Sequence, residues 1–363
     1  MTASSTTPPA ITARDRLRDR RAIRIWLYVI ATMVLAIVVV GGATRLTESG
    51  LSITEWEPIQ GVIPPMSEEA WQDEFLKYQQ IPEFQQINRE MTLAEFKTIY
   101  WWEWSHRLLA RLIGVVFLVP FLWLWATGRI ERSLWPRLIG IFVLGGLQGA
   151  AGWWMVASGL TERTDVSQYR LAIHLMLAAF IFAYLLWVAR GLRPPRAAAQ
   201  YPLNGTRWFA NSLIVLVLLQ LYFGALVAGL EAWRATTDWP GMGNGFVPPG
   251  LFAGDVPWWR NFFENMLLVQ FQHRILAYVI AILVVVHAFA LARGAPGSRV
   301  AFSSYRLVAI VGLQVAVGVV TLVTASPNVS IDVALTHQFL AFLLLAGVVV
   351  HRRSMTQPIP IRG

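Results

Sequence analysis

The chain has 363 residues, of which 56% are hydrophobic and only 14% are charged. A soluble domain of this size needs far more polar surface, so the composition excludes an ordinary soluble protein and indicates an integral membrane protein. The formal net charge is +9. Cysteine is absent, which excludes disulfides, thiolate-bound iron–sulfur clusters and covalent heme attachment through a C-x-x-C-H motif.

Eight apolar stretches are each long enough to cross a bilayer, for which about 20 residues are needed. Backbone groups in lipid must pair within their own segment, so we expect each stretch to be a helix. The first stretch is too long for a signal-peptide core and lacks a small-residue cleavage site, so it is also interpreted as a spanning helix. The predicted spans are residues 25–44, 105–126, 134–157, 168–190, 208–230, 265–291, 305–325 and 331–351.

The basic residues are concentrated in alternate loops. Most of the 30 Lys and Arg residues fall in the N-terminal tail 1–24, in every second loop, including the linker 191–207, and in the C-terminal tail 352–363. The positive-inside rule predicts that both termini are cytoplasmic and that three long, Trp- and acid-rich connections face the outside of the cell inner membrane. The net charge is thus a topology signal, so we expect no nucleic-acid partner. Residues 1–20 are expected to be a disordered arm with affinity for anionic lipid.

The second half of the chain resembles the first. Four helices per repeat is an even number, so the two halves run in the same direction. We expect two parallel four-helix bundle repeats, residues 25–190 and 208–351, related by a pseudo-twofold axis along the membrane normal. The matching pieces are 105–110 with 272–277, 147–148 with 313–314, His174 with His337 and, more weakly, Gly42 with Gly229 and Trp56 with Trp239.

Each even-numbered span carries one histidine a few residues from its outer end. Histidine inside a membrane is costly and usually functional, although a lone one often only bonds a neighbouring helix. At 1.5 Å per residue, all four lie roughly 8–15 Å below the outer surface. Two facing imidazoles suit the axial positions of one heme iron, whereas zinc needs three or four ligands with a carboxylate or thiol nearby. The pattern favours heme sites at His106 and His174 and at His273 and His337.

Arginine and glycine accompany these histidines. Arg107 and Arg274 directly follow two of them and can reach a heme propionate, although snorkelling to the interface explains either one alone equally well. The span 134–157 is rich in glycine, which permits close approach of a flat macrocycle or of a neighbouring helix. The glycines are Gly145, Gly146, Gly149 and Gly152.

The repeats differ at one informative position. Glu103 lies three residues before His106 and on the same helical face, whereas Gln270 lies three residues before His273. A carboxylate can take a proton or stabilise positive charge, and an amide cannot. We therefore expect a reactive heme site in the first half and a redox-cofactor site in the second. The alternative is that Glu103 is only an interfacial acid among tryptophans.

Two further histidines lie near the inner ends of their helices. His287 follows His273 by 14 residues, and His351 follows His337 by the same interval. Fourteen residues are about four turns, or roughly 21 Å, which is the spacing of stacked hemes in cytochrome b proteins. Neither has a partner in the first half, so an interfacial or packing role is favoured.

Several motifs together resemble the heme A synthase family, and the resemblance runs from the first span to the eighth. Members are eight-helix proteins with a four-helix internal repeat. They oxidise the C8 methyl of heme O by two successive hydroxylations, and the gem-diol then loses water to give the formyl group of heme A. The motifs are residues 41–52 followed by Trp56-Glu57-Pro58, Glu103-Trp104-Ser105-His106-Arg107, 224–230 and 272–274.

The resemblance implies roles for the site residues. His273 and His337 would be the axial ligands of a resident heme b, and His106 and His174 would hold the substrate heme, with Glu103 as the essential carboxylate. Some members carry a cysteine pair in the first outer loop. This chain has none, so it resembles the cysteine-free form of alphaproteobacteria and mitochondria.

Two other classes are compatible with parts of the pattern. A di-heme electron-transfer protein of cytochrome b type would use the 14-residue histidine pairs and would not need Glu103. A transporter built from parallel repeats should have matching broken helices, and the spans do not contain them. For an enzyme of the heme A synthase type, the heme O synthase, a membrane farnesyltransferase, is the expected supplier of substrate. The sequence leaves the electron acceptor and the source of the inserted oxygen open.

Overall fold

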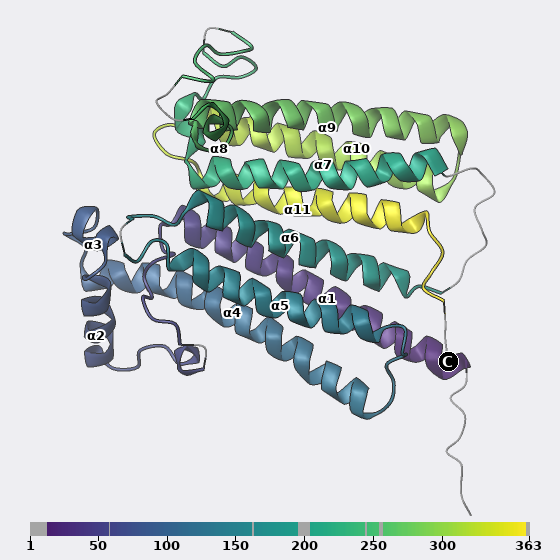
Figure 1. Ribbon diagram of the computed structural model, residues 1–363, viewed down its shortest axis with the longest axis horizontal. Coiled ribbons are helices and arrows are strands. Elements are labelled where there is room, and N and C mark those ends of the chain that lie inside the picture. Colours follow the sequence, from purple (N-terminus) through teal and green to yellow (C-terminus); the bar gives the residue numbers. More distant parts are fainter. Residues whose placement is uncertain are drawn as a thin grey trace, which may run out of the picture.

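The computed structural model describes residues 13–57, 59–161, 163–194, 204–243, 245–253 and 257–360. Every regular element in this part of the chain is a helix (Figure 1). Eight helices within these described ranges are long and apolar enough to cross a membrane, which confirms the predicted all-α membrane fold class. They are α1 (Ala13–Leu46), α4 (Leu93–Ala126), α5 (Trp135–Val156), α6 (Gln168–Gly191), α7 (Asn204–Gly229), α9 (Met266–Gly294), α10 (Arg299–Val323) and α11 (Ile331–Ser354).

The long helices pack as two groups of four (Figure 1). In the first group α4 and α6 pack against α1, and α5 packs against both α4 and α6. In the second group α9 and α11 pack against α7, and α10 packs against both α9 and α11. The groups meet where α6 contacts α7 and α11 and where α1 contacts α11. Exchanging the groups therefore reproduces the contact pattern, as the expected repeats 25–190 and 208–351 require; the pseudo-twofold axis itself stays a prediction.

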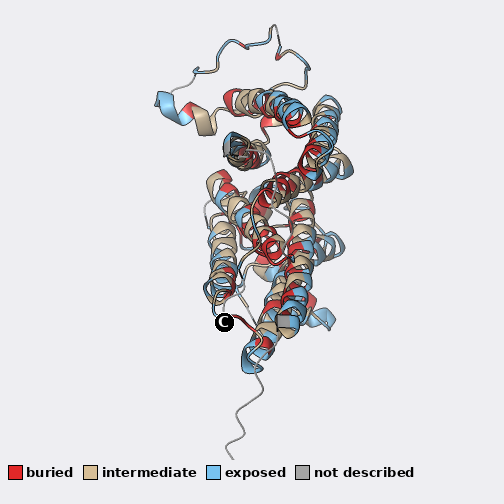
Figure 2. Ribbon diagram, turned by 90° about the vertical axis from the view of Figure 1, so that its right-hand side faces the viewer, coloured by how far each residue is buried: buried red, intermediate tan, exposed pale blue. Residues whose placement is uncertain are grey.

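The core lies where the two groups meet. Figure 2 shows buried residues on the inward faces of the helices and exposed residues on the outward faces. Leu27, Phe182, Leu213 and Phe342, from α1, α6, α7 and α11, belong to one buried apolar cluster. Many apolar side chains on the other faces, such as Val119 at 59% exposure, are open, which is the distribution expected where the solvent is lipid.

Short helices cover one end of the bundle, here called the cap end. They are α2 (Glu68–Tyr78), α3 (Pro82–Gln86) and α8 (Asn261–Glu264), with 3₁₀ turns at Gln60–Val62, Ala232–Ala235 and Trp258–Arg260. Ser67 caps α2 by accepting a hydrogen bond from the Ala70 backbone. Trp71, Phe75 and Tyr78 of α2 pack with Phe96 at the start of α4. The cap is therefore a small apolar core of its own, built on the extension of α4 beyond the bundle.

That extension begins earlier than the sequence pattern predicted. The structure starts α4 at Leu93 instead of residue 105, because Thr92 and Glu95 form a capping box in which each side chain bonds the backbone N–H of the other. The capping residues lie outside the apolar stretch, so hydropathy alone does not detect them.

The prediction that residues 13–20 belong to a disordered arm is wrong. α1 begins at Ala13, and Arg20 is 4% exposed. Its guanidinium pairs with Glu131 at 2.5 Å and donates to the backbone carbonyls of Ile359 and Pro360. This buried ion pair and its additional bonds connect the start of α1 to the segment after α4 and to the C-terminal tail.

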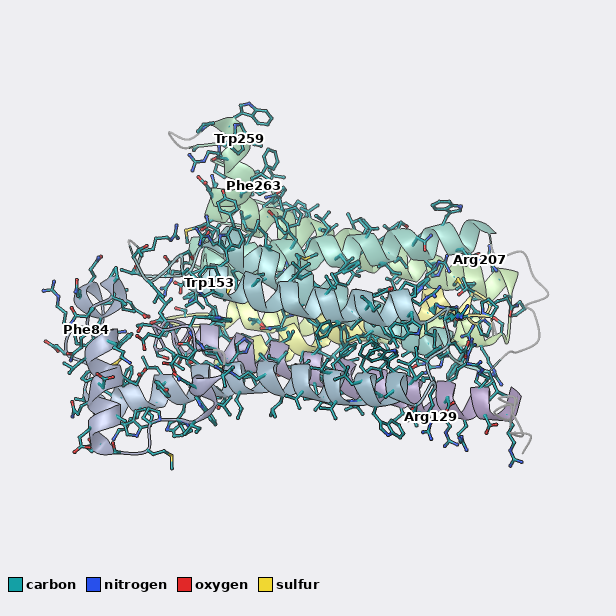
Figure 3. All side chains as sticks on the ribbon, turned by 60° about the horizontal axis from the view of Figure 1, so that its bottom comes forward. Phe84, Arg129, Trp153, Arg207, Trp259 and Phe263 are labelled. Carbon is teal, nitrogen blue, oxygen red and sulfur yellow. The ribbon has the colours of Figure 1, made fainter. Side chains whose placement is uncertain are left out.

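The end opposite the cap is here called the basic end. Figure 3 shows Arg129 and Arg207 at this end, away from Phe84 and Trp259. The described C-terminal tail also folds there, with the Ile359 backbone N–H donating to Gly191. Four predicted features lie partly or wholly outside the described residues, namely 1–12 and 361–363 of the tails, 195–203 of the linker, and Pro58 of the first motif.

Candidate heme sites

Each of the four predicted ligand histidines packs against a glycine of another helix, and this glycine is called its glycine seat below. In each case it lies on the preceding long helix, and at three of the four glycines an added Cβ would come within 3.0 Å of the ring. A Cβ added at Gly318 would stand 2.6 Å from Cε1 of His337. The corresponding distances are 2.8 Å for Gly41 and His106, 2.9 Å for Gly152 and His174, and 3.3 Å for Gly224 and His273.

Glutamines support three of the four histidines. The amide nitrogen of Gln220 lies 3.1 Å from Nδ1 of His273 and donates to that residue's backbone carbonyl at 3.0 Å. Gln148 has the same two contacts with His174, both at 3.2 Å. Gln314 lies 3.4 Å from Nε2 of His337. These amides fix the position of the rings within the bundle.

The second pair has the separation that a bis-imidazole iron site requires. The ring centroids of His273 and His337 are 6.4 Å apart, with the ring planes at 73°. An iron about 2 Å from one nitrogen of each ring separates the centroids by roughly 6 Å. Nδ1 of His337 is buried with no hydrogen-bond partner among the described residues. The ring spacing, the neutral donors and this unpaired nitrogen fit a heme.

The first pair is brought together in the other half. His106 of α4 and His174 of α6 are close enough to interact electrostatically, and Nδ1 of His106 is buried without a partner in the described part of the chain. Added Cβ atoms at Gly145, Gly146 and Gly149 of α5 would meet nothing within 4 Å. Tight helix packing within this chain therefore does not explain those glycines, whereas Gly152 of the same run is the seat of His174.

Glu103 is held by a complete set of hydrogen bonds beside the first pair. It is 3% exposed. One carboxylate oxygen accepts from Ser52 Oγ and from the Ile53 backbone N–H, both at 2.8 Å. The other accepts from the Arg107 guanidinium at 2.6 Å. The carboxylate thus ties the loop after α1 to α4, one turn before His106.

Gln270 occupies the matching place beside the second pair and is also 3% exposed. Its amide nitrogen donates to the Thr236 carbonyl at 2.9 Å, and its oxygen accepts from Arg274 at 3.3 Å. Arg274 also donates to the carbonyls of Asp238 and Gly241. In both halves this residue bonds the arginine one turn later and the preceding loop, but Glu103 accepts hydrogen bonds from its loop whereas Gln270 donates one.

Arg107 and Arg274 each hold the preceding loop by donating hydrogen bonds to its backbone carbonyls. Arg107 donates to the carbonyls of Ile53 and Glu55 at 2.7 and 2.8 Å, as Arg274 does to its own loop. A cavity of about 240 Å³ lies beside Arg107 and Arg111 under the cap. Contact of Arg107 and Arg274 with a propionate stays a prediction.

Another buried carboxyl, which the sequence patterns did not single out, lies in the cap above the first pair. Glu83 of α3 is 6% exposed. Burial, together with the nearby carboxylates of Glu48 and Glu103, raises its pKa to about 8, while Tyr78 and Arg45 act in the opposite direction. Its Oε2 has no partner among the described residues. Burial and the neighbouring carboxylates thus favour the protonated form of this carboxyl group.

The inner histidines bond each other and cannot hold a heme between them in this arrangement. Nε2 of His287 lies 2.9 Å from Nε2 of His351, and Nδ1 of His351 lies 2.7 Å from Ser303 Oγ. An iron between two imidazoles needs about 4 Å between the nitrogens. The cytochrome b alternative relied on His287 and His351 as ligands of a second heme, and their direct contact does not support it.

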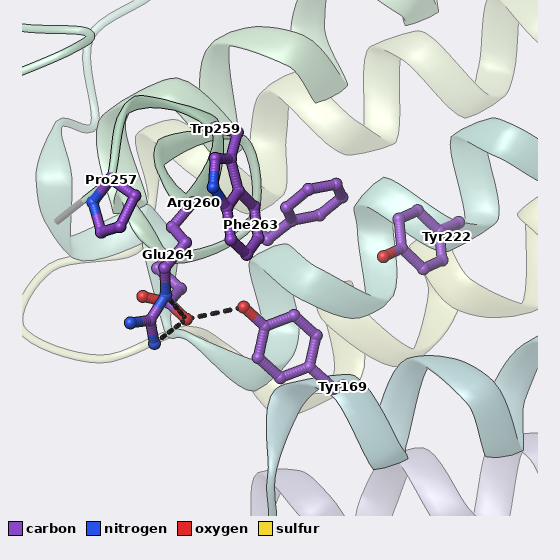
Figure 4. A pocket seen from close by; sticks show the side chains of 7 residues that line it. All are labelled: Tyr169, Tyr222, Pro257, Trp259, Arg260, Phe263 and Glu264. Atoms are coloured by element: carbon purple, nitrogen blue, oxygen red, sulfur yellow. Dashed lines mark hydrogen bonds and ion pairs between the residues drawn. The ribbon is translucent and has the colours of Figure 1, made fainter.

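A further cavity of about 560 Å³ lies at the cap end of the second group, between α6, α7 and α8. Figure 4 shows Tyr169 and Arg260 both directed to the carboxylate of Glu264, with Trp259, Phe263 and Tyr222 around them. The Tyr169 hydroxyl donates to Glu264 at 2.7 Å and Arg260 at 2.8 Å. The carboxylate is already paired, and no histidine lines this cavity.

Sequence reasoning missed the role of the glycine seats and the glutamines. The predicted alignment of Gly42 with Gly229 between the two halves was in the wrong register. In the structure the equivalent glycines are Gly41, which contacts His106, and Gly224, which contacts His273. Their interval of 183 residues is the interval between Trp56 and Trp239. The sequence does contain a pattern that marks three of these glycines and their glutamines: Q-x-x-x-G occurs at 148–152, 220–224 and 314–318.

Comparisons with known proteins agree with this architecture. The COX15-CtaA family, described as cytochrome oxidase assembly protein, matches residues 24–349. A protein named heme A synthase from Chelativorans sp. (strain BNC1) is 54% identical over 346 residues, which cover 95% of this chain and 94% of that protein. Proteins of the same name from Brucella ovis and Brucella abortus (strain S19) are 49% identical over 342 residues, or 93% of this chain and 92% of theirs. The chain belongs to the COX15-CtaA family of cytochrome oxidase assembly proteins.

Proposed function

We propose that this chain is an oxidoreductase that converts heme O to heme A, the activity named for its relatives. Two histidine pairs in matching glycine seats support two heme sites. The observation that supports different roles for them is Glu103 in the first half against Gln270 in the second, each bonded to the arginine one turn later on its helix.

In this proposal the second half holds a resident heme b. His273 and His337 supply the axial imidazoles, and Gln220 and Gln314 orient them. Bound there, the heme supplies one-electron redox chemistry. Gln270 keeps this half free of an ionisable side chain beside the ligand, which suits a site that carries electrons without exchanging protons.

The first half holds the substrate. His106 and His174 would bind the iron of heme O, and the open glycine face of α5 would leave room for the macrocycle. Glu103 accepts protons or stabilises positive charge as the C8 methyl is oxidised by two successive hydroxylations, with the gem-diol then losing water. Arg107 keeps this carboxylate in place at 2.6 Å. Arg107 and Arg274 are also the candidates for contact with the propionates.

The arrangement in the membrane follows from charge. Arg129 and Arg207 mark the basic end (Figure 3), and the start of α1 meets the C-terminal tail there. We place this end and both termini in the cytoplasm, and the cap and heme sites on the periplasmic side of the cell inner membrane. Heme O is a lipophilic product of a membrane farnesyltransferase, so the heme O synthase is the proposed partner.

Pigment analysis tests this function. The purified chain, co-expressed with a source of heme O, should yield formyl heme in the extract in addition to heme b. Full occupancy by unmodified heme, with no formyl product, would contradict the proposal. A chain that yields formyl heme with only the second half loaded would contradict the division of roles between the halves.

A further inference from the structure

The two halves differ in how closely two equivalent helices approach each other. In the second half α9 and α10 pack together closely, whereas their equivalents in the first half, α4 and α5, touch at few positions. Both α4 and α5 lie on the side of the first group that faces away from the second group (Figure 1). The boundary between them, lined by Gly114, Gly145 and Gly149 and here called the α4–α5 seam, therefore faces lipid.

Glycine lines the α5 side of this seam. Gly145 lies two turns before Gly152, the glycine seat of His174, so both share the inward face of the helix. Ile141, one turn before Gly145, is buried on that face. Gly145 is nevertheless exposed, and a Cβ added at Gly145 or Gly149 would meet nothing within 4 Å. Open space thus extends from the level of the first histidine pair toward the membrane interior for about two turns, or roughly 10 Å.

The second half has larger side chains at the equivalent positions. Alignment of residues 147–148 with 313–314 sets Gly145 against Val311 and Gly149 against Val315. Val311 is 4% exposed and belongs to the buried core. The space that is open in the first half is therefore occupied by the protein itself in the second.

The α4 side of the seam shows the same difference. The alignment of its ligand histidine with that of α9 sets Gly114 against Ala281. Ala281 packs against the buried core, whereas a Cβ added at Gly114 would meet nothing within 4 Å in the described chain. One turn further in, Phe117 of α4 stacks on Phe142 of α5 with ring centroids 6.1 Å apart. This aromatic contact joins the two helices, so it marks the inner limit of the open part of the seam.

The proposed substrate and the proposed cofactor differ in a group that this space fits. Heme O carries an isoprenoid chain that a farnesyltransferase adds, and heme b lacks this chain. With Arg107 at the propionates, the opposite and apolar edge of the macrocycle points away from the cap, along the seam. Burial of an isoprenoid chain between apolar helices is favourable. Extra methyl groups in the same space would collide with the chain.

We propose that the α4–α5 seam is the groove for the isoprenoid chain of the substrate heme, and that Gly145 and Gly149 select this heme for the first half. Val311 and Val315 restrict the second half to a heme without the chain. The inference rests on the proposed function and deepens it, because it names the part of the substrate that distinguishes the two sites. An open seam also lets the chain extend into lipid while the macrocycle lies at the histidines.

Heme binding to the full chain tests this proposal without turnover. The chain is purified with heme b in the second half and titrated with heme O or with further heme b, anaerobically and without an electron acceptor. Gly145→Val and Gly149→Val introduce the residues of α10. Each should weaken binding of heme O to the first half about 10–100-fold and leave binding of heme b there nearly unchanged. His174→Ala, which lacks a ligand of the first pair, gives the background uptake.

Gly146→Val is the matched control. It makes the same change one residue away on α5, where an added Cβ also meets nothing within 4 Å, but on a face that points away from Gly152. It should bind heme O as wild type does. The low-spin absorption of the heme in the second half reports whether each variant has folded.

The possible outcomes separate the occupants of the seam. Unchanged heme O affinity in Gly145→Val and Gly149→Val would leave the seam to lipid, and if an oligomer also dissociated it would assign the seam to a second copy of the chain. Equal losses of heme O and heme b, or an equal loss in Gly146→Val, would indicate general damage. Each of these results would overturn the inference alone. A wild-type chain that binds no heme O in the first half would overturn the proposed function and the inference with it.

Discussion

The carboxylate of Glu103 accepts a hydrogen bond from Arg107 at 2.6 Å, one turn further along the same helix. The Glu103–Arg107 pair has both a structural and a chemical consequence. It holds the loop after α1 through the Ser52 hydroxyl and the Ile53 N–H, and it places a carboxyl group one turn from His106, a predicted ligand. A substitution at Glu103 therefore has to be read for folding and for chemistry at the same time.

Glu103→Gln should retain bound heme in both halves and stop formation of heme A. The amide keeps the shape of the side chain and one acceptor oxygen, as Gln270 keeps one for Arg274 in the second half, but it cannot take a proton. Heme content and formyl heme are measured on the same preparation. Gln270→Glu is the matched control and should keep its heme. Loss of heme from Glu103→Gln would show that the carboxylate is structural.

Gly318→Ala should lower heme occupancy of the second half severalfold. The added methyl would stand 2.6 Å from Cε1 of His337, a separation that forces the ring out of its place. Gly312→Ala on the same helix is the control, because its Cβ would meet nothing within 4 Å. Heme per chain and the low-spin absorption spectrum are the measurements. Equal occupancy in the two variants would show that the seat is not needed.

The sequence predicted the features that depend on composition and on residue identity. Lipid as solvent requires long apolar helices, so eight spans were predictable from hydropathy. A histidine in such a span stands out by its cost, and four at matching depth indicated two sites. The pairing of Glu103 with Gln270 was readable because their neighbours His106 and His273 align without gaps.

Other features depend on packing, which one sequence reveals less directly. Glycines are frequent in membrane helices, so nothing in composition distinguishes Gly41, a ligand seat, from Gly42 beside it. The bonds from Arg107 and Arg274 to their loops use backbone carbonyls as acceptors, and these have no sequence signature. The early start of α4 depends on a capping box, and the first turns of α1 carry the ion pair of Arg20 with Glu131; both features lie outside the apolar stretches.

Arg20→Met should destabilise the protein by about 3–5 kcal/mol, because it leaves the buried Glu131 carboxylate uncompensated. Both side chains are less than 5% exposed. Thermal or denaturant unfolding in detergent measures the change. Arg20→Met combined with Glu131→Leu should recover part of the loss. The control is Arg163→Met, which removes an exposed pair with Asp165 and should cost less than about 1 kcal/mol. Equal costs for Arg20→Met and Arg163→Met would contradict the role of the buried pair.

His287→Ala should leave the number of hemes per chain unchanged. Its imidazole bonds His351 directly at 2.9 Å and stacks on Phe209, which is a packing arrangement. Pyridine hemochrome analysis against protein concentration gives the stoichiometry, and His273→Ala serves as the positive control that should lose one heme. A loss of heme from His287→Ala equal to that of His273→Ala would restore the cytochrome b interpretation.

The stability of the cap should fall as pH rises between about 4.5 and 8. The pKa of Glu83 is raised from 4.5 to about 8, first by burial and then by the carboxylates of Glu48 and Glu103. In this range the folded cap retains a proton that the unfolded segment has released. The folded state therefore binds more protons, and its stability is greatest below pH 4.5 and decreases through pH 8.

Glu83→Gln should remove most of this slope, because an amide reproduces the neutral form at every pH. Hydrogen exchange of the backbone amides of α2 and α3, measured from pH 5 to pH 9 and corrected for the intrinsic rate, reports the local stability. Glu90→Gln, a change at an exposed acid of the same cap, should keep the wild-type slope. Because Glu103 is one of the charges that raise the pKa of Glu83, Glu103→Gln should shift the transition of the cap to lower pH. An unshifted transition would mean that Glu103 does not act on the pKa of Glu83.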